Sequence, residues 1–210
     1  MRAKTLPLLL ALVALVAAPS AARADGFLDA WHPNQSFWAI GWEVSFPTTS
    51  FRSDWVNRPS FAGGQFEVRV GLMERLSVGV AMNYNWFDQN FSQVTVTYPE
   101  YTISGPVYRR LGAFSARGTV HYYLTSTRLQ PFVGVGVGGI WTATRIQTSD
   151  QQRYAYSSYF AVDPEAGLML STSDSFAFQL LGRYQWTAAS FYEVKNAQWV
   201  SVQIGFGWIF

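Results

Sequence analysis

Apolar and polar residues alternate along most of this chain. In the segment WVSVQIGFGWIF, every even position from Val200 to Phe210 is apolar, and the odd positions from Ser201 on are polar or glycine except Ile209. A period of two is typical of a β-strand with one apolar and one polar face. The same period occurs in seven further segments: 37–46, 65–72, 76–86, 114–124, 131–141, 160–170 and 176–186. The sequence therefore predicts an all-β chain of eight strands.

The connections between these segments alternate in length. Short turns are expected at 73–75, 125–130 and 172–175, and long connections at 47–60, 87–106, 144–158 and 187–198. Short turns at one end and long loops at the other are typical of an up-and-down barrel in an outer membrane. We therefore expect a single domain, an eight-stranded antiparallel transmembrane β-barrel over residues 36–210.

The first residues have the pattern of an export signal. Arg2 and Lys4 precede an apolar run over residues 6–18, and Ala22-Arg23-Ala24 fits a cleavage site. Such a leader is removed during secretion. We therefore expect a cleaved signal peptide at 1–24, cut after Ala24, and a short N-terminal tail at 25–35.

Composition narrows the class of protein further. Aromatic residues make up 17% and charged residues 13% of the chain, whereas soluble domains average about 25% charged. The formal net charge of +2 depends on basic residues in the leader, so it gives no indication of nucleic-acid binding. The absence of cysteine excludes a disulfide scaffold and a thiolate metal site, and no cofactor is expected.

Aromatic residues on the apolar face are sorted to the two ends of the strands. One belt is Trp38, Tyr122, Phe176, Trp208 and Phe210, and the other is Phe46, Trp86, Tyr108, Trp141, Phe160 and Trp186. Aromatic girdles of this kind mark the two membrane interfaces of a transmembrane barrel. A soluble lipocalin-like barrel is the alternative, but its outer face would be charged.

The pattern resembles the eight-stranded outer-membrane β-barrel family, which includes OmpA-type transmembrane domains, OmpX and the opacity proteins. The most specific stretches are PFVGVGVGG at 131–139 and QIGFGWIF at 203–210. The resemblance implies residence in the bacterial outer membrane, contact with its lipid including lipopolysaccharide, and insertion by the barrel-assembly machinery. It also implies an assembly signal in the last strand, formed by Ile204, Phe206, Trp208 and Phe210.

Charged residues on the polar face are predicted to lie inside the barrel. They are Glu43, Glu67, Arg69, Arg117, Asp163, Glu165 and Arg183, together with His121. Side chains fill the interior of so narrow a barrel, and buried charges must pair. The sequence therefore predicts a polar lumen with an ion-pair plug. A gated polar conduit is the alternative, and such a polar lumen counts against the hydrophobic passage of OmpW-like proteins.

Two motifs suggest chemistry that the context does not support. Gly134, Gly136 and Gly139 fit G-x-G-x-x-G, but a nucleotide-binding loop requires a following helix and this segment continues as a strand. We expect these glycines to face a crowded lumen or to allow strand curvature. By resemblance, acyl-transfer enzymes of this size place His, Ser and an acid at the extracellular rim, whereas His121 lies near the opposite end. We therefore expect no enzymatic activity.

The long connections are the remaining candidates for function, because binding residues are often carried on loops. Their tyrosines and arginines are candidate surface contacts, and the arginines could also pair with lipopolysaccharide phosphates: Tyr98, Tyr101, Arg109, Arg110, Arg145, Arg153, Tyr154 and Tyr156. Alternatively, these stretches simply extend the strands as hairpins. The sequence predicts a non-enzymatic surface or structural protein, with a narrow channel for small or hydrophobic solutes as the alternative. It does not identify a surface ligand.

Overall fold

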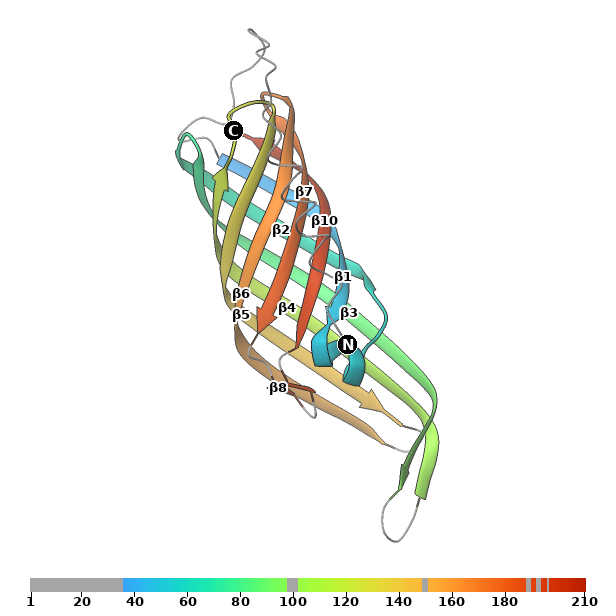
Figure 1. Ribbon diagram of the computed structural model, residues 1–210. Coiled ribbons are helices and arrows are strands. Elements are labelled where there is room, and N and C mark those ends of the chain that lie inside the picture. The colour runs from blue at the N-terminus through green and yellow to red at the C-terminus, as the bar shows by residue number, and fades with distance from the viewer. Residues whose placement is uncertain (1–35, 98–101, 149–150, 188–189, 192–193, 196) are drawn as a thin grey trace, which may run out of the picture.

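The computed structural model describes residues 36–97, 102–148, 151–187, 190–191, 194–195 and 197–210. Eight strands form a closed antiparallel barrel in the order β1-β10-β7-β6-β5-β4-β3-β2 (Figure 1). Their bounds are β1 Ser36–Thr48, β2 Ser60–Met73, β3 Leu76–Thr97, β4 Thr102–Tyr123, β5 Leu129–Gln147, β6 Gln152–Ser173, β7 Phe176–Thr187 and β10 Gln198–Ile209. The predicted eight-stranded barrel is confirmed.

Three smaller elements were not predicted. A short π-helix, η1 (Phe51–Trp55), lies in the connection from β1 to β2. Two short strands, β8 (Ser190–Phe191) and β9 (Val194–Lys195), pair with each other between β7 and β10. No helix in the described part of the chain is long and apolar enough to cross a membrane.

The barrel closes where β1 pairs with β10. Their register runs from Phe37 opposite Ile209 to Thr48 opposite Gln198. At its end the Ser36 amide donates to the Phe210 carbonyl at 2.8 Å, and the Phe210 amide donates to the Ser36 carbonyl at 2.9 Å. Closure leaves the barrel without an unpaired strand edge, which is the condition for a β-structure to span hydrocarbon.

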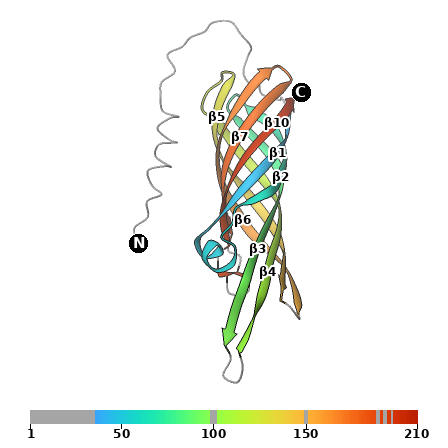
Figure 2. The same cartoon turned by 90° about the vertical axis from the view of Figure 1, so that its right-hand side faces the viewer.

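The two ends of the barrel differ, as predicted. At one end, here called the turn end, short turns join β2 to β3, β4 to β5 and β6 to β7. At the other, here called the hairpin end, β3 and β4 stay paired as far as Thr97 and Thr102. Strands β5 and β6 likewise pair as far as Gln147 and Gln152. Figure 2 shows the β3–β4 hairpin projecting beyond the rest of the barrel.

Of the two possibilities left open for the long connections at 87–106 and 144–158, binding loops or strands extended as hairpins, the hairpins describe these segments. Most of their described residues continue the strands. The physical reason lies in composition, because these segments are rich in Thr, Val, Tyr and Ile, which favour extended pairing. An antiparallel ladder can continue wherever both strands keep this character.

The outward face of the barrel is apolar over its middle. Ile40 is 47% exposed, Val80 52% and Ile204 60% when the chain is considered alone. Exposed apolar side chains in such numbers require an apolar surrounding, since soluble monomers rarely carry large contiguous apolar patches. The polar side chains of each strand therefore face the interior of the barrel.

The register at the closing seam can be tested with cysteine pairs, because the chain has no cysteine of its own. Val44 lies opposite Val202, where Cα atoms of an antiparallel pair are about 4.5–5.5 Å apart, within disulfide range. We expect Val44→Cys/Val202→Cys to cross-link on oxidation, which a non-reducing gel detects as a faster-migrating denatured chain.

The matched control is Val44→Cys/Phe206→Cys, which moves one partner four residues, or about 13 Å, along β10. This pair should remain uncrosslinked. Equal cross-linking of the two pairs, or none at Val44 and Val202, would contradict the register.

Candidate functional site

The interior of the barrel is organised around the glycines of β5. Gly134 lies between His121 of β4 and Glu165 of β6 in the register, and Gly136 lies between Thr119 and Asp163. These glycines contribute no side chain, so groups from the two neighbouring strands meet across β5. His121 Nε2 lies 2.8 Å from Glu165 Oε2 in this way. The prediction that the glycines face a crowded lumen fits Gly134 and Gly136, whereas it was wrong for Gly139, which lies on the outward face beside Trp141.

A second contact crosses β5 beside the first. Arg117 Nη1 donates to Asp163 Oδ2, and the same nitrogen lies 3.9 Å from Glu165 Oε1. Gln185 Nε2 donates to Asp163 Oδ2 at 3.1 Å. Strands β4, β6 and β7 are thereby tied together inside the barrel.

Arg183 of β7 extends the network across the lumen. Its Nε donates to Glu165 Oε1 at 2.9 Å, and its Nη1 donates to Glu43 Oε2 at 3.4 Å. Its Nη2 donates to Gln65 Oε1. Glu43 also accepts a hydrogen bond from Asn85 Nδ2 at 2.8 Å. One guanidinium therefore links β7 to β6, β1 and β2.

Glu67 and Arg69 form an adjacent pair on β2. Arg69 Nε and Nη2 each donate to the Glu67 carboxylate at 2.7 Å, a two-point contact that fixes both side chains. Thr119 Oγ1 donates to Glu67 at 3.3 Å. Arg69 Nη1 donates to the Tyr123 hydroxyl at 3.2 Å, and its guanidinium lies 5.0 Å from the centre of the Phe132 ring.

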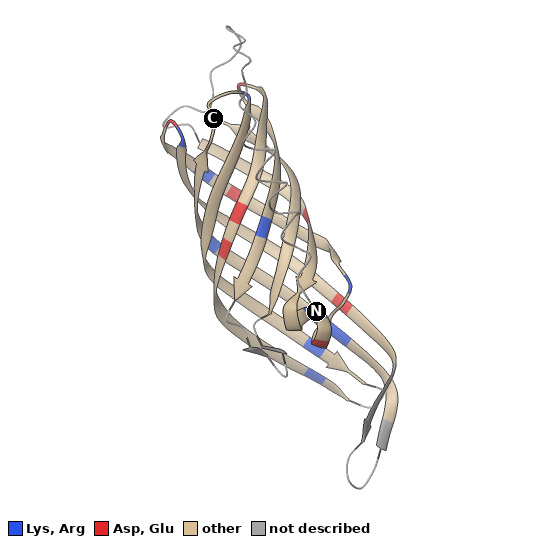
Figure 3. Cartoon of the chain, in the orientation of Figure 1, with Lys and Arg blue, Asp and Glu red and all other residues tan. Residues whose placement is uncertain are grey.

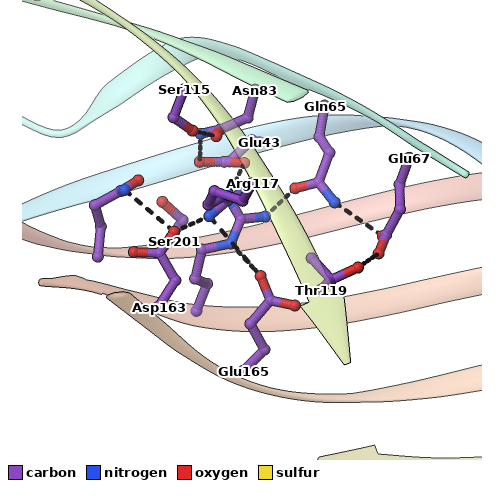
Figure 4. Close-up of polar contacts among 12 residues, drawn as sticks. Glu43, Gln65, Glu67, Asn83, Ser115, Arg117, Thr119, Asp163, Glu165 and Ser201 are labelled. Atoms are coloured by element: carbon purple, nitrogen blue, oxygen red, sulfur yellow. Dashed lines mark hydrogen bonds and ion pairs between the residues drawn. The ribbon is translucent and has the colours of Figure 1, made fainter. Parts of the chain in front are cut away.

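All eight side chains predicted for the lumen lie in this network, and none is more than 5% exposed. Four carboxylates face three guanidinium groups. His121 lies 2.8 Å from Glu165 and 3.9 Å from Glu67, so its protonated form would supply the fourth positive charge. Figure 4 shows polar side chains from several strands meeting in one cluster, and Figure 3 shows acidic and basic positions close together midway along the barrel.

The charged part of the predicted polar lumen is confined to the middle of the barrel. Toward the turn end lies an apolar layer of Phe37, Ala39, Tyr123, Phe132, Met169, Ala177, Leu181 and Ile209. Toward the hairpin end lies another, of Phe51, Trp55, Val56, Phe87, Leu111, Ala113, Ile140, Ala161, Ala197 and Trp199. The two apolar layers enclose the network of paired charges and keep water from it. Exclusion of water strengthens the interaction between buried charges only when they are paired. Ile209, the exception to the alternation, belongs to the first layer.

The hairpin-end layer includes a segment of the connection at 47–60, which was expected only as a long loop. η1 places Phe51 and Trp55 inside the barrel mouth, 0% and 4% exposed. The Phe51 ring lies edge-on to Phe87 at 5.2 Å. Arg109 Nη1 donates to the Asp54 carbonyl at 2.6 Å, and its guanidinium lies 5.1 Å from the Trp55 ring centre. One residue in the sequence could have indicated this layer: Phe87 is apolar and lies at a position of β3 that faces inward.

A serine lies beside His121, but on the neighbouring strand, so the sequence around His121 did not indicate it. Ser77 of β3 lies opposite His121 in the register, and Glu165 lies on its other side. The Ser77 hydroxyl, however, donates to the Tyr123 hydroxyl at 3.5 Å, and Ser77 and His121 are both 0% exposed. Both side chains are therefore enclosed in the barrel interior. Among the described residues, no group of three acidic, His or Cys side chains is arranged to hold a metal ion.

The predicted assembly residues all lie on the outward face, three of them on β10 and Phe210 directly after it. Their exposed fractions are 60% for Ile204, 43% for Phe206, 36% for Trp208 and 70% for Phe210. Trp208 stacks on Trp38 across the closing seam, with ring centres 4.3 Å apart. The geometry is that of an outward aromatic strip, and its role in assembly stays a prediction.

The candidate surface contacts lie on strands rather than on loops. Arg109 and Arg110 are on β4, Arg145 is on β5, and Arg153, Tyr154 and Tyr156 are on β6. Tyr98 and Tyr101 lie outside the described residues. Arg109 contacts η1, whereas Arg110 and Arg145 lie directly opposite each other. These residues therefore do not form one loop site.

Solved structures provide a comparison where sequences do not. No protein-family model and no curated protein matches the chain. Neisserial surface protein A is similar, with TM-score 0.56 and 11% identity over 84% of this chain and 97% of that one. Ail, the attachment invasion locus protein of Yersinia pestis, solved with the heparin analogue sucrose octasulfate, has TM-score 0.54 and 12% identity over 85% and 99%. The chain has the fold of the eight-stranded outer-membrane β-barrels. The suspected resemblance is thus confirmed at the level of fold.

The glycines of β5 give a matched pair of variants. A Cβ at Gly134 would lie 2.6 Å from the Val120 carbonyl oxygen and 3.0 Å from His121 Nε2, whereas at Gly136 its nearest neighbour is Arg117 Cδ at 3.5 Å. We expect Gly134→Ala to lower the free energy of unfolding by about 1–3 kcal/mol, the usual cost of overpacking.

Gly136→Ala should change it by less than about 1 kcal/mol, because the added methyl fits ordinary contact distances. Urea unfolding of the chain in lipid vesicles, followed by tryptophan fluorescence, measures both. Equal effects of the two substitutions would show that the close contact at Gly134 does not limit packing.

Proposed function

We propose that the protein is a non-enzymatic integral protein of the bacterial outer membrane, whose barrel is a closed anchor for surface hairpins. The observation that carries the proposal is the filled interior. A charged network occupies its middle, and an apolar layer lies at each end. A barrel packed in this way supports its hairpins rigidly and passes little through its centre.

Placement in the outer membrane is supported by the outward apolar band, the aromatic girdles and the barrel closure. In this proposal residues 1–24 are a signal peptide cleaved after Ala24, residues 25–35 form a short tail, and residues 36–210 are the barrel. The outward strip from Ile204 to Phe210 is recognised by the barrel-assembly machinery. The turn end then faces the periplasm, and the hairpin end faces the outside.

The extended hairpins are the surfaces available for envelope structure or surface interaction. They carry exposed aromatic side chains, with Tyr156 78% and Tyr154 58% exposed. Tyrosine provides contact area at low entropic cost. Ail, which shares the fold, was solved with a heparin analogue, and that precedent supports a surface-interaction role without identifying a ligand for this chain.

A narrow channel for small or hydrophobic solutes is the second candidate. It is favoured by one feature, because the hairpin-end layer is closed partly by η1, which belongs to a connection and not to a barrel strand. Outward movement of η1 would remove Phe51 and Trp55 from the mouth. The charged network below it would still block the lumen.

Conductance across a planar lipid bilayer distinguishes the two functions. We expect the native chain to show no regular conductance steps. Phe51→Ala/Trp55→Ala should also stay closed, because the charged network lies below η1. Combining these substitutions with Arg183→Ala removes the linker of the network and should increase conductance.

Trp42→Ala on the outward face, which is 51% exposed, is the control for general loss of bulk. Steady conductance steps from the native chain would refute the closed anchor. Steps from Phe51→Ala/Trp55→Ala with Arg183 intact would favour the channel.

A further inference from the structure

Two neighbouring features on the outward face of β3, β4, β5 and β6 together have the form of a lipid site. The first is a groove of about 460 Å³. Its floor includes Gly112 and Ala143, which lie opposite each other in the register. Its sides include the aromatic residues Tyr84, Trp86, Phe114, Trp141 and Tyr156.

The groove exists because its floor is made of small residues. A Cβ at Gly112 would lie 3.2 Å from the Tyr84 hydroxyl and 3.4 Å from the Trp86 ring, so these side chains already lean over the floor. A larger residue at 112 would fill the groove. Small residues flanked by aromatic rings leave a slot suited to a linear hydrocarbon chain.

The second feature is a pair of arginines next to the groove. Arg110 and Arg145 lie opposite each other, each two residues beyond the groove floor on its strand, or about 7 Å along it. Both line a hollow of about 400 Å³ together with Asp88, Tyr108 and Gln147. The positive charges are therefore placed immediately outside the apolar slot.

These two arginines are only partly neutralised. Arg110 Nε lies 2.7 Å from Asp88 Oδ1, and the two side chains are 45% and 51% exposed. Arg145 Nη2 donates to the neutral Gln147 side chain at 2.8 Å. Asp88 is the one carboxylate among the residues that line the hollow, against Arg109, Arg110 and Arg145, so the hollow carries an excess positive charge.

The position of Arg110 and Arg145 along the barrel axis can be compared with the thickness of the apolar band of a membrane barrel. Arg110 is twelve residues along β4 from Tyr122, an outward aromatic at the turn end. At about 3.3 Å per residue and a tilt of about 40°, that separation is about 30 Å along the barrel axis, against an apolar band about 25 Å tall. Arg110 and Arg145 therefore lie at the level of lipid headgroups, and the groove lies at the boundary of the hydrocarbon.

We infer that this face binds one phosphorylated glycolipid of the outer leaflet. A phosphate group lies between Arg110 and Arg145, where guanidinium groups donate paired hydrogen bonds to its oxygens. One acyl chain lies in the groove over Gly112 and Ala143, and Tyr108 and Gln147 face the sugar hydroxyls. The inference rests on the proposed membrane orientation, which places the hairpin end in the glycolipid leaflet.

The test uses the full chain folded in phosphatidylcholine nanodiscs, titrated with fluorescent bisphosphorylated lipid A. Arg110→Gln/Arg145→Gln should weaken binding at least about tenfold, because it removes the charge-assisted contacts. Gly112→Leu should weaken lipid A binding several-fold by filling the groove. Arg58→Gln/Arg75→Gln removes the same charge elsewhere and should bind as the native chain does.

Each alternative has its own outcome. Native-like lipid A binding by Arg110→Gln/Arg145→Gln would overturn the site, and so would equal binding of dephosphorylated lipid A by the native chain. Equal affinity for phosphatidylglycerol would overturn the glycolipid assignment. A heat-dependent mobility shift on a dodecyl sulfate gel checks that each variant is folded. Conductance steps from the native chain in a planar bilayer would contradict the closed anchor, whereas the nanodisc titration alone decides the lipid site.

Discussion

The interior of a narrow barrel can hold charges only if each one finds a partner, and the remaining features of this structure follow from how that is achieved. Strand β5 presents Gly134 and Gly136 to the lumen, so Arg117 and His121 of β4 reach Asp163 and Glu165 of β6 across it. Removing one member of such a buried pair typically costs about 3–5 kcal/mol, because the other charge is left unpaired. The absence of a large side chain at these two positions thus leaves room for the pairing that makes the charges tolerable.

The inward and outward faces of the barrel have different surroundings and therefore different side chains. The inward face encloses the charged network between two apolar layers, one of which includes η1 from the connection between β1 and β2. The outward face is apolar over its middle and becomes charged at the hairpin end. A filled interior makes the barrel an anchor, and it leaves the outward surfaces and hairpins as the places where lipids or partners can bind.

The barrel could be predicted from the sequence, because a period of two along each strand determines which side chains face inward. The same parity correctly placed Glu67, Arg183 and the other charged residues in the lumen. It could not show which charges pair, since the contact between Arg117 and Asp163 depends on strand register and on the space above Gly136. Nor could it show that Phe51 of η1 folds into the mouth, because a connection has no periodicity to indicate its direction.

The central claim is that the buried charges act as a coupled set, and a double-mutant cycle on Arg117 and Asp163 tests it most directly. Free energies of unfolding would be measured in lipid vesicles for Arg117→Met, Asp163→Asn and the double variant. Each single substitution should cost about 3–5 kcal/mol, and the double variant should cost at least about 2 kcal/mol less than the two costs combined. Strictly additive costs would show that the two charges are independent, which would contradict the paired interior on which this account depends.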